Sequence, residues 1–148
     1  MDILIRMEQA EINLLGRSLR RIDQKLLTTE GDPHRVRIWY QGGEPYFDLF
    51  IELQRETIEW FQMTLRGRSI SWQRQDQVWQ TGITNELRTD DVMFYPASKT
   101  IESDRQTNPD FFALAEAILT TRKGEPLFDQ LLEIFRGHYS PSPLKNIS

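Results

Sequence analysis

The sequence predicts an α+β domain: an N-terminal helix, an antiparallel β-meander of four or five strands, and two C-terminal helices packed on the sheet. Three observations predict it. The stretch 35–73 consists of short runs that are rich in β-branched and aromatic residues and that alternate with a period of two. An apolar stripe with helical spacing precedes this stretch, and two amphipathic segments with clear start signals follow it.

The segment from about residue 5 to residue 27 is expected to be a helix. Its apolar residues lie three and four apart and form one stripe: Ile12, Leu15, Leu19, Ile22 and Leu26. Gly16 is the weak point of this pattern. Arg20 and Arg21 fall on the opposite side, which we interpret as a solvated face. The stripe could pack within the domain or pair with its copy in a second chain.

Five runs are interpreted as strands: 35–41, 46–53, 57–65, 69–73 and 78–83. Glycine-bearing turns join the first run to the second and the third to the fourth. The connection at 54–56 has no glycine, so the register of that hairpin is the least defined. The pattern then lapses from 84 to 107, where only 92–95 resembles a strand. A segment of this kind is either a functional lid or a plain surface connection.

Side-chain parity divides the strands between two faces. The apolar face, which should lie against helices, carries Val36, Ile38, Tyr40, Phe47, Leu49, Ile51, Leu53, Phe61, Met63, Leu65, Ile70 and Trp72. The polar face carries Arg35, Arg37, Trp39, Asp48, Phe50, Glu52, Ile58, Trp60, Gln62 and Thr64. One buried and one wetted face is typical of an antiparallel sheet. The three large aromatic residues on the polar face, Trp39, Phe50 and Trp60, depart from that pattern.

Two helices are expected after the sheet. Asn108 followed by Pro109 is typical of a helix start, and Gly124 is expected to end that helix. Pro126 then begins a second helix. We expect a single domain over 1–139 and a flexible C-terminal tail over 140–148, which contains a Ser-Pro-Ser-Pro sequence.

Composition narrows the class of protein. The chain has 148 residues, which suits one domain, and no cysteine, which suits a reducing compartment. Its net charge of -4 comes from well-mixed charges and argues against a general affinity for nucleic acid. The first residues lack a signal-peptide core, and no apolar run is long enough to cross a bilayer. We therefore expect a cytoplasmic protein that binds neither nucleic acid nor membrane.

The sequence contains no recognised catalytic motif. The two histidines, His34 and His138, stand far apart without ligand spacing, so no metal site is expected. The glycine-rich nucleotide loops and the Gly-x-Ser-x-Gly elbow do not occur, and we expect no cofactor. These observations favour a protein that is not an enzyme.

The leading functional hypothesis is a non-enzymatic binding or adaptor domain. Trp39, Phe50, Trp60, Arg35 and Arg37 would form a protein-binding patch, because aromatic and arginine residues are enriched at the centres of interfaces. The partner would be another protein or a second copy, and we expect a homodimer. The order of elements resembles that of small secretion-chaperone-like domains, which implies a chaperone-like role. The trio could instead be covered by the N-terminal helix, and both interpretations stay open.

The alternative hypothesis is a small-molecule-binding or hydrolytic pocket. Asp48 and Glu52 have the same parity as Arg35 and Arg37, and the neighbouring indoles could raise the pKa of one carboxyl group. The 84–107 loop would roof this pocket. Ordinary cross-strand ion pairing on a wet sheet face explains the same four residues.

Overall fold

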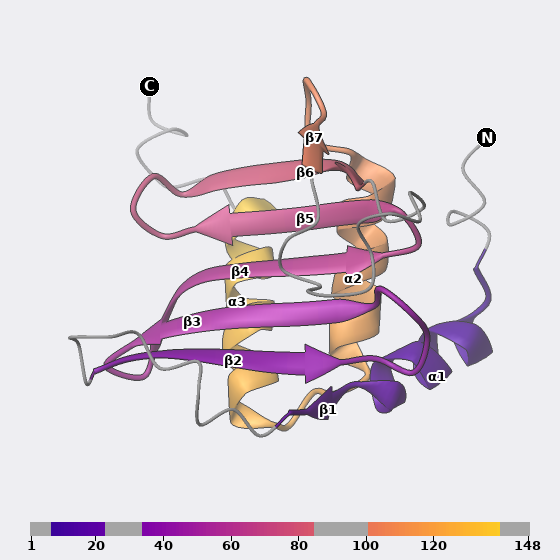
Figure 1. The fold of residues 1–148 in the computed structure, drawn as a ribbon, viewed down its shortest axis with the longest axis horizontal. Coiled ribbons are helices and arrows are strands. Elements are labelled where there is room, and N and C mark those ends of the chain that lie inside the picture. The colour runs from indigo at the N-terminus through magenta and orange to yellow at the C-terminus, as the bar shows by residue number, and fades with distance from the viewer. Residues whose placement is uncertain (1–6, 23–33, 85–100, 140–148) are drawn as a thin grey trace.

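The computed structural model describes residues 7–22, 34–84 and 101–139. In chain order the elements are α1 (Gln9–Ser18), β1 (Arg20–Arg21), β2 (Arg35–Gln41), β3 (Asp48–Gln54), β4 (Thr57–Leu65), β5 (Arg68–Gln73), β6 (Val78–Thr84), β7 (Ile101–Ser103), α2 (Pro109–Thr120) and α3 (Pro126–Tyr139). Within this part of the chain the strands form one antiparallel sheet of seven, in which each strand pairs with the next (Figure 1). The α+β class, the antiparallel sheet and the C-terminal helices are confirmed.

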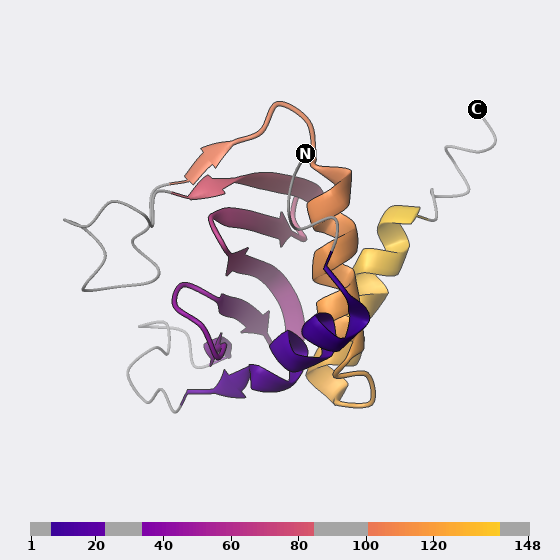
Figure 2. The ribbon, with the colours of Figure 1, turned by 90° about the vertical axis from the view of Figure 1, so that its right-hand side faces the viewer.

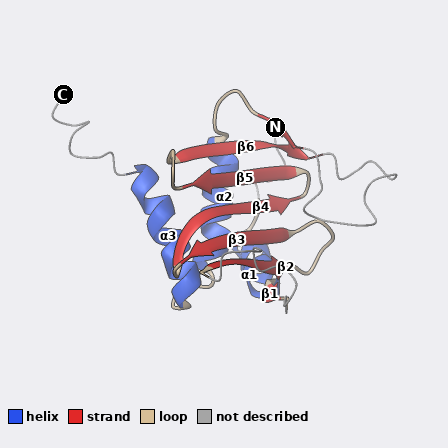
Figure 3. Cartoon of the chain, turned by 60° about the vertical axis from the view of Figure 1, so that its left-hand side comes forward, coloured by secondary structure: helices blue, strands red, loops and turns tan. Residues whose placement is uncertain are grey.

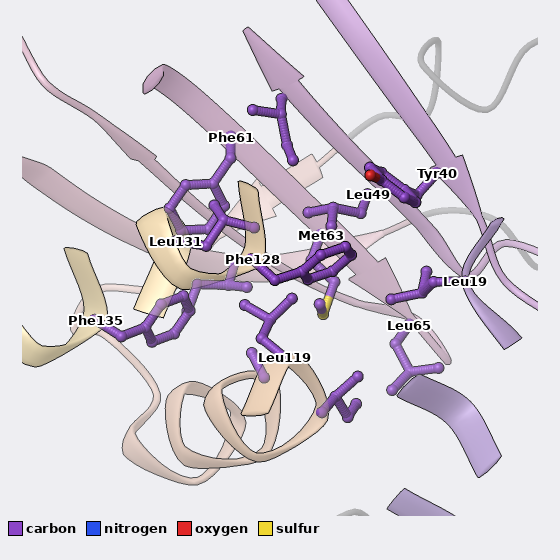
Figure 4. Close-up of a cluster of buried hydrophobic side chains, with 14 of the residues drawn as sticks. Leu19, Tyr40, Leu49, Phe61, Met63, Leu65, Leu119, Phe128, Leu131 and Phe135 are labelled. Atoms are coloured by element: carbon purple, nitrogen blue, oxygen red, sulfur yellow. The ribbon is translucent and has the colours of Figure 1, made fainter. Parts of the chain in front are cut away.

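One face of the sheet lies against helices. α2 and α3 run across the strands on that side, and α1 packs beside α2 (Figures 1 to 3). Phe47, Leu49, Ile51 and Phe61, which alternation assigns to the apolar face, have no exposed surface. Figure 4 shows Phe61 and neighbouring strand residues meeting α3 through Phe128, Leu131 and Phe135. The burial predicted from alternation is therefore confirmed, and the core is the layer between the sheet and the helices.

Ile58 lies on the opposite face from the one predicted, because a β-bulge interrupts β4. Glu52 pairs with Trp60, but its neighbour Leu53 pairs with Ile58, so Glu59 is an extra residue. An extra residue reverses the alternation on one side of it. Ile58 is consequently fully buried in the core, whereas Trp60 remains on the polar face.

The bulge is tied to its surroundings by two side chains. The backbone N–H of Ile58 donates to Oε1 of Gln130 on α3, at 2.8 Å. Arg74 donates from Nε to the carbonyl of Ile58 at 2.8 Å, and its guanidinium lies 3.4 Å from Glu59. Because these side chains hydrogen-bond to the backbone N–H and the carbonyl of Ile58, both groups keep a partner despite the bulge.

The N-terminal helix is shorter than predicted, and its last residues belong to the sheet. α1 ends at Ser18, Leu19 is extended, and Arg20 and Arg21 form β1, which pairs with the end of β2. The two arginines therefore do not continue a helical ridge. The first half of the stripe, from Ile12 to Leu19, lies in the core of the same chain. This part of the stripe therefore packs within the domain, and Leu26 lies outside the described residues.

The sequence also missed β7, and the strand count is higher than the four or five expected. β7 has three residues, too few for alternation to identify. Its end is fixed by Thr81 on β6: the Thr81 hydroxyl donates to Asp104 at 2.6 Å and accepts from the backbone N–H of Asn108 at 2.8 Å. Asn108 caps α2 as expected. The strand-like run 92–95 and the tail 140–148 lie outside the described residues.

The glycine-free turn has a defined geometry. Arg55 and Glu56 adopt positive φ values of 51° and 70°, and Gln54 pairs with Thr57 across them. Two left-handed residues in succession form the tight hairpin turn whose twist matches that of the strands. The strand bounds of β2 and β4 agree with those predicted.

Candidate functional site

The predicted patch lies on the sheet face opposite α2 and α3 (Figure 2). Two rows of residues cross the central strands there. In the first row Arg37 of β2, Glu52 of β3 and Trp60 of β4 are register partners. In the second row Trp39 pairs with Phe50. The bulge places Trp60 in the first row, so the fold brings the three predicted aromatic residues together. α1 packs beside α2, so it does not cover them.

Trp39 is held in one orientation by two contacts. Its indole stacks on Phe50 with ring centroids 5.7 Å apart and an interplanar angle of 13°. Its Nε1–H donates to Oδ1 of Asp48 at 2.9 Å. Phe50 and Asp48 are buried, with 5% and 2% of their surface exposed, whereas Trp39 and Trp60 are partly exposed. Phe50 is therefore a base for the indole and offers little contact surface of its own.

The two arginines share one partly buried carboxylate, that of Glu52, whose side chain is 18% exposed. Arg37 donates to Glu52 at 3.2 Å, and its guanidinium lies 5.1 Å from the centroid of the Trp60 ring. Arg35 lies 3.9 Å from the other oxygen of Glu52 and donates from Nε to Gln54 at 3.0 Å. Two guanidinium groups thus share one carboxylate. Sequence reasoning missed Gln54, although its parity places it on the same face.

The two carboxylates of the alternative pocket are poorly placed for joint catalysis. Four residues along a strand correspond to roughly 13 Å, whereas a paired acid and base act across about 5–10 Å. Asp48 is buried against the Trp39 indole, and Glu52 is occupied by Arg37 and Arg35. This arrangement is typical of cross-strand ion pairing on a sheet. Most of the 84–107 roof, residues 85–100, lies outside the described residues.

The described surface has hollows away from this patch, of which two are defined by their lining residues. One of about 290 Å³ lies between α1 and two hairpin turns, where Arg66 binds both Glu11 and Glu44. The other, of about 490 Å³, lies along α3 between Lys123 and Arg136. Both are shallow, and neither is lined by the carboxylates of the alternative pocket.

The described residues offer neither a metal-binding cluster nor a membrane-spanning helix. No group of three His, Cys, Asp or Glu residues there is arranged to hold a metal ion. No helix in the same ranges has the length and apolar character needed to cross a bilayer.

Comparison of the chain with protein-family models, with curated proteins and with solved structures found no match. The site is therefore interpreted from its own geometry.

Proposed function

We propose that this protein is a non-enzymatic, chaperone-like binding or adaptor domain. It contacts other proteins through the sheet face that carries none of the described helices, which we call the helix-free face. One observation carries the proposal: Trp39 and Trp60 are partly exposed, and specific contacts hold their rings in place. Stacking and a hydrogen bond fix Trp39, and the Arg37 guanidinium lies over Trp60. Rings that are already ordered lose little side-chain entropy on association, which favours binding.

A second copy of the chain is the first partner that we propose, giving a homodimer. Tryptophan and arginine are the residue types most often found at the energetic centres of protein interfaces. Trp39, Trp60, Arg35 and Arg37 lie together on neighbouring strands of this face. The cysteine-free composition fits a reducing compartment, so a cytoplasmic location is part of the proposal.

The test is the double substitution Trp39→Ser and Trp60→Ser. We expect association measured by light scattering to weaken at least roughly tenfold, because each indole is an interface anchor. The circular dichroism spectrum should remain that of the wild type. Leu14→Ser is the matched control, since Leu14 on α1 is 68% exposed and lies away from this face. Unaltered association in the double variant would contradict the proposal.

A second variant separates binding from folding. Trp39 also donates to the buried Asp48, so its loss leaves that carboxylate without one partner and lowers stability. Trp60→Ser alone avoids this cost. If the single variant folds and still associates like the wild type, Trp60 is not an anchor.

The alternative function, a small-molecule or hydrolytic pocket at Asp48 and Glu52 with Arg35 and Arg37, ranks second. Its support is the burial of Asp48 on the same sheet face as Arg35 and Arg37. The separation of the two carboxylates and their structural hydrogen bonds count against it.

A further inference from the structure

On the described strands, the charged residues of the helix-free face are confined to one half of it, and positive charges exceed negative ones. Register places Arg20, Arg35 and Arg37 there, together with the carboxylates of Asp48 and Glu52. Three positive and two negative groups give a local charge of +1, although the chain carries -4. Asp48 is only 2% exposed, so solvent meets the arginines mainly beside Glu52. The paired positions of β5 and β6 on this face are uncharged: Ser69, Ser71, Gln73, Val78, Gln80 and Gly82.

The two central arginines have hydrogen-bonding capacity to spare. A guanidinium carries five N–H donors. Arg35 uses one on Gln54, and Arg37 uses one on Glu52. The two side chains remain 43% and 37% exposed. Both can therefore bind a carboxylate through two parallel hydrogen bonds, which is the strongest geometry available to them.

β2 arranges these groups at a regular spacing. Arg35, Arg37 and Trp39 occupy alternate positions of one strand, so they follow one another at roughly 6.6 Å intervals on the same face. An extended segment laid along β2 presents its own alternate side chains at the same interval. Two carboxylates followed by an aromatic ring would then meet the two guanidinium groups and the indole.

From this spacing and charge we infer that this face also docks an acidic, extended segment of another protein on β2, with two carboxylates and an aromatic residue at alternate positions. The inference rests on the proposed function and specifies the chemistry of the partner. The positive charge of the arginines is complementary to the carboxylates of the segment, and the ordered Trp39 indole contacts its aromatic residue.

Fluorescence anisotropy with two labelled peptides tests the inference. The acidic probe has the order Glu-Ser-Glu-Ser-Phe between glycines, and the neutral probe replaces both glutamates by glutamine. We expect the acidic probe to bind roughly tenfold or more tightly than the neutral one, because charge-assisted hydrogen bonds are stronger than neutral ones. The difference should shrink as salt is raised.

Two variants with the same change of net charge test whether the preference for the acidic probe depends on β2. Arg35→Gln with Arg37→Gln should remove the preference for the acidic probe. Arg17→Gln with Arg136→Gln changes the net charge equally but lies on α1 and α3, so this variant should keep the preference. Equal binding of the two probes, binding of neither, or a preference that survives the β2 variant would overturn the inference. So would tighter binding of an eight-nucleotide thymidine strand through the same arginines.

The result also separates this inference from the proposed function. If acidic and neutral probes bind equally while Trp39→Ser with Trp60→Ser still abolishes self-association, the contact face stands and the partner's chemistry is wrong. If the tryptophan variant changes neither peptide binding nor self-association, the contact face itself is wrong.

Discussion

Replacing Gly16 by alanine is expected to destabilise the domain by about 1–3 kcal/mol, even though alanine is the better helix former. Gly16 is buried where α1 meets the end of α2. An added Cβ would overlap the hydroxyl of Thr121 and come within 2.8 Å of the Ile118 carbonyl. That hydroxyl donates to the same carbonyl at 2.6 Å, so its position is constrained. The two helices would have to move apart. The measurement is the urea midpoint of unfolding.

Gly137 provides the matched control. It lies in α3, and a Cβ added there meets no other atom within 4 Å. Gly137→Ala should therefore show only the helix-propensity gain, up to about 1 kcal/mol. If Gly16→Ala proved as stable as Gly137→Ala, the close approach of α1 and α2 would be wrong.

Replacing Arg122 by methionine is expected to cost about 2–4 kcal/mol, because hydrogen bonds from a charged group to two backbone carbonyls are lost. Arg122 donates to the carbonyls of Gly16 and Leu19 at 3.0 and 2.6 Å. Carbonyls at the end of a helix lack the usual donor four residues further on; the Gly16 carbonyl also accepts from the backbone N–H of Leu19 at 3.3 Å. The guanidinium also binds Glu125 and lies 4.7 Å from the Phe128 ring centroid.

Thermal unfolding measures this effect. For a chain of this size the expected loss corresponds to a fall in Tm of roughly 5–15 °C. Arg136→Met is the control: that side chain is 66% exposed and forms a surface ion pair with Glu133. Surface ion pairs contribute roughly 0–1 kcal/mol, so its Tm should hardly change. Similar Tm values for the two variants would show that the hydrogen bonds of Arg122 to the end of α1 do not stabilise the domain.

The central strands could be predicted because alternation over seven to nine residues specifies both the strand and its faces. Ile58 could not be placed in the same way. Ile58 and Trp60 are both apolar and two apart, so nothing local reveals that an extra residue at Glu59 separates their faces. The side chain that satisfies the bulge, Gln130, lies 72 residues away in the sequence.

The end of α1 was unpredictable for a similar reason. Its apolar stripe continues past Ser18, but the backbone turns at Leu19, whose carbonyl is bound by Arg122, 103 residues further along. Tertiary contacts override helix propensity at such positions. At the candidate site, parity correctly placed Arg37, Glu52 and Trp60 on one face, and pairing set them side by side. Side-chain parity predicts on which face of the sheet a residue lies, but it does not predict how deeply the residue is buried. The burial of Phe50 was therefore not predictable.

We propose that the helix-free face of the sheet is the protein-contact surface. Oxidative footprinting of the wild-type protein over a range of concentrations, with masses from light scattering, tests it most directly. We predict that the mass rises towards twice 17.5 kDa while oxidation of Trp60 falls with the same midpoint, and that oxidation of the exposed Leu14 stays constant. Constant oxidation of Trp60 while the mass doubles, or a mass that stays at one chain, would contradict the account.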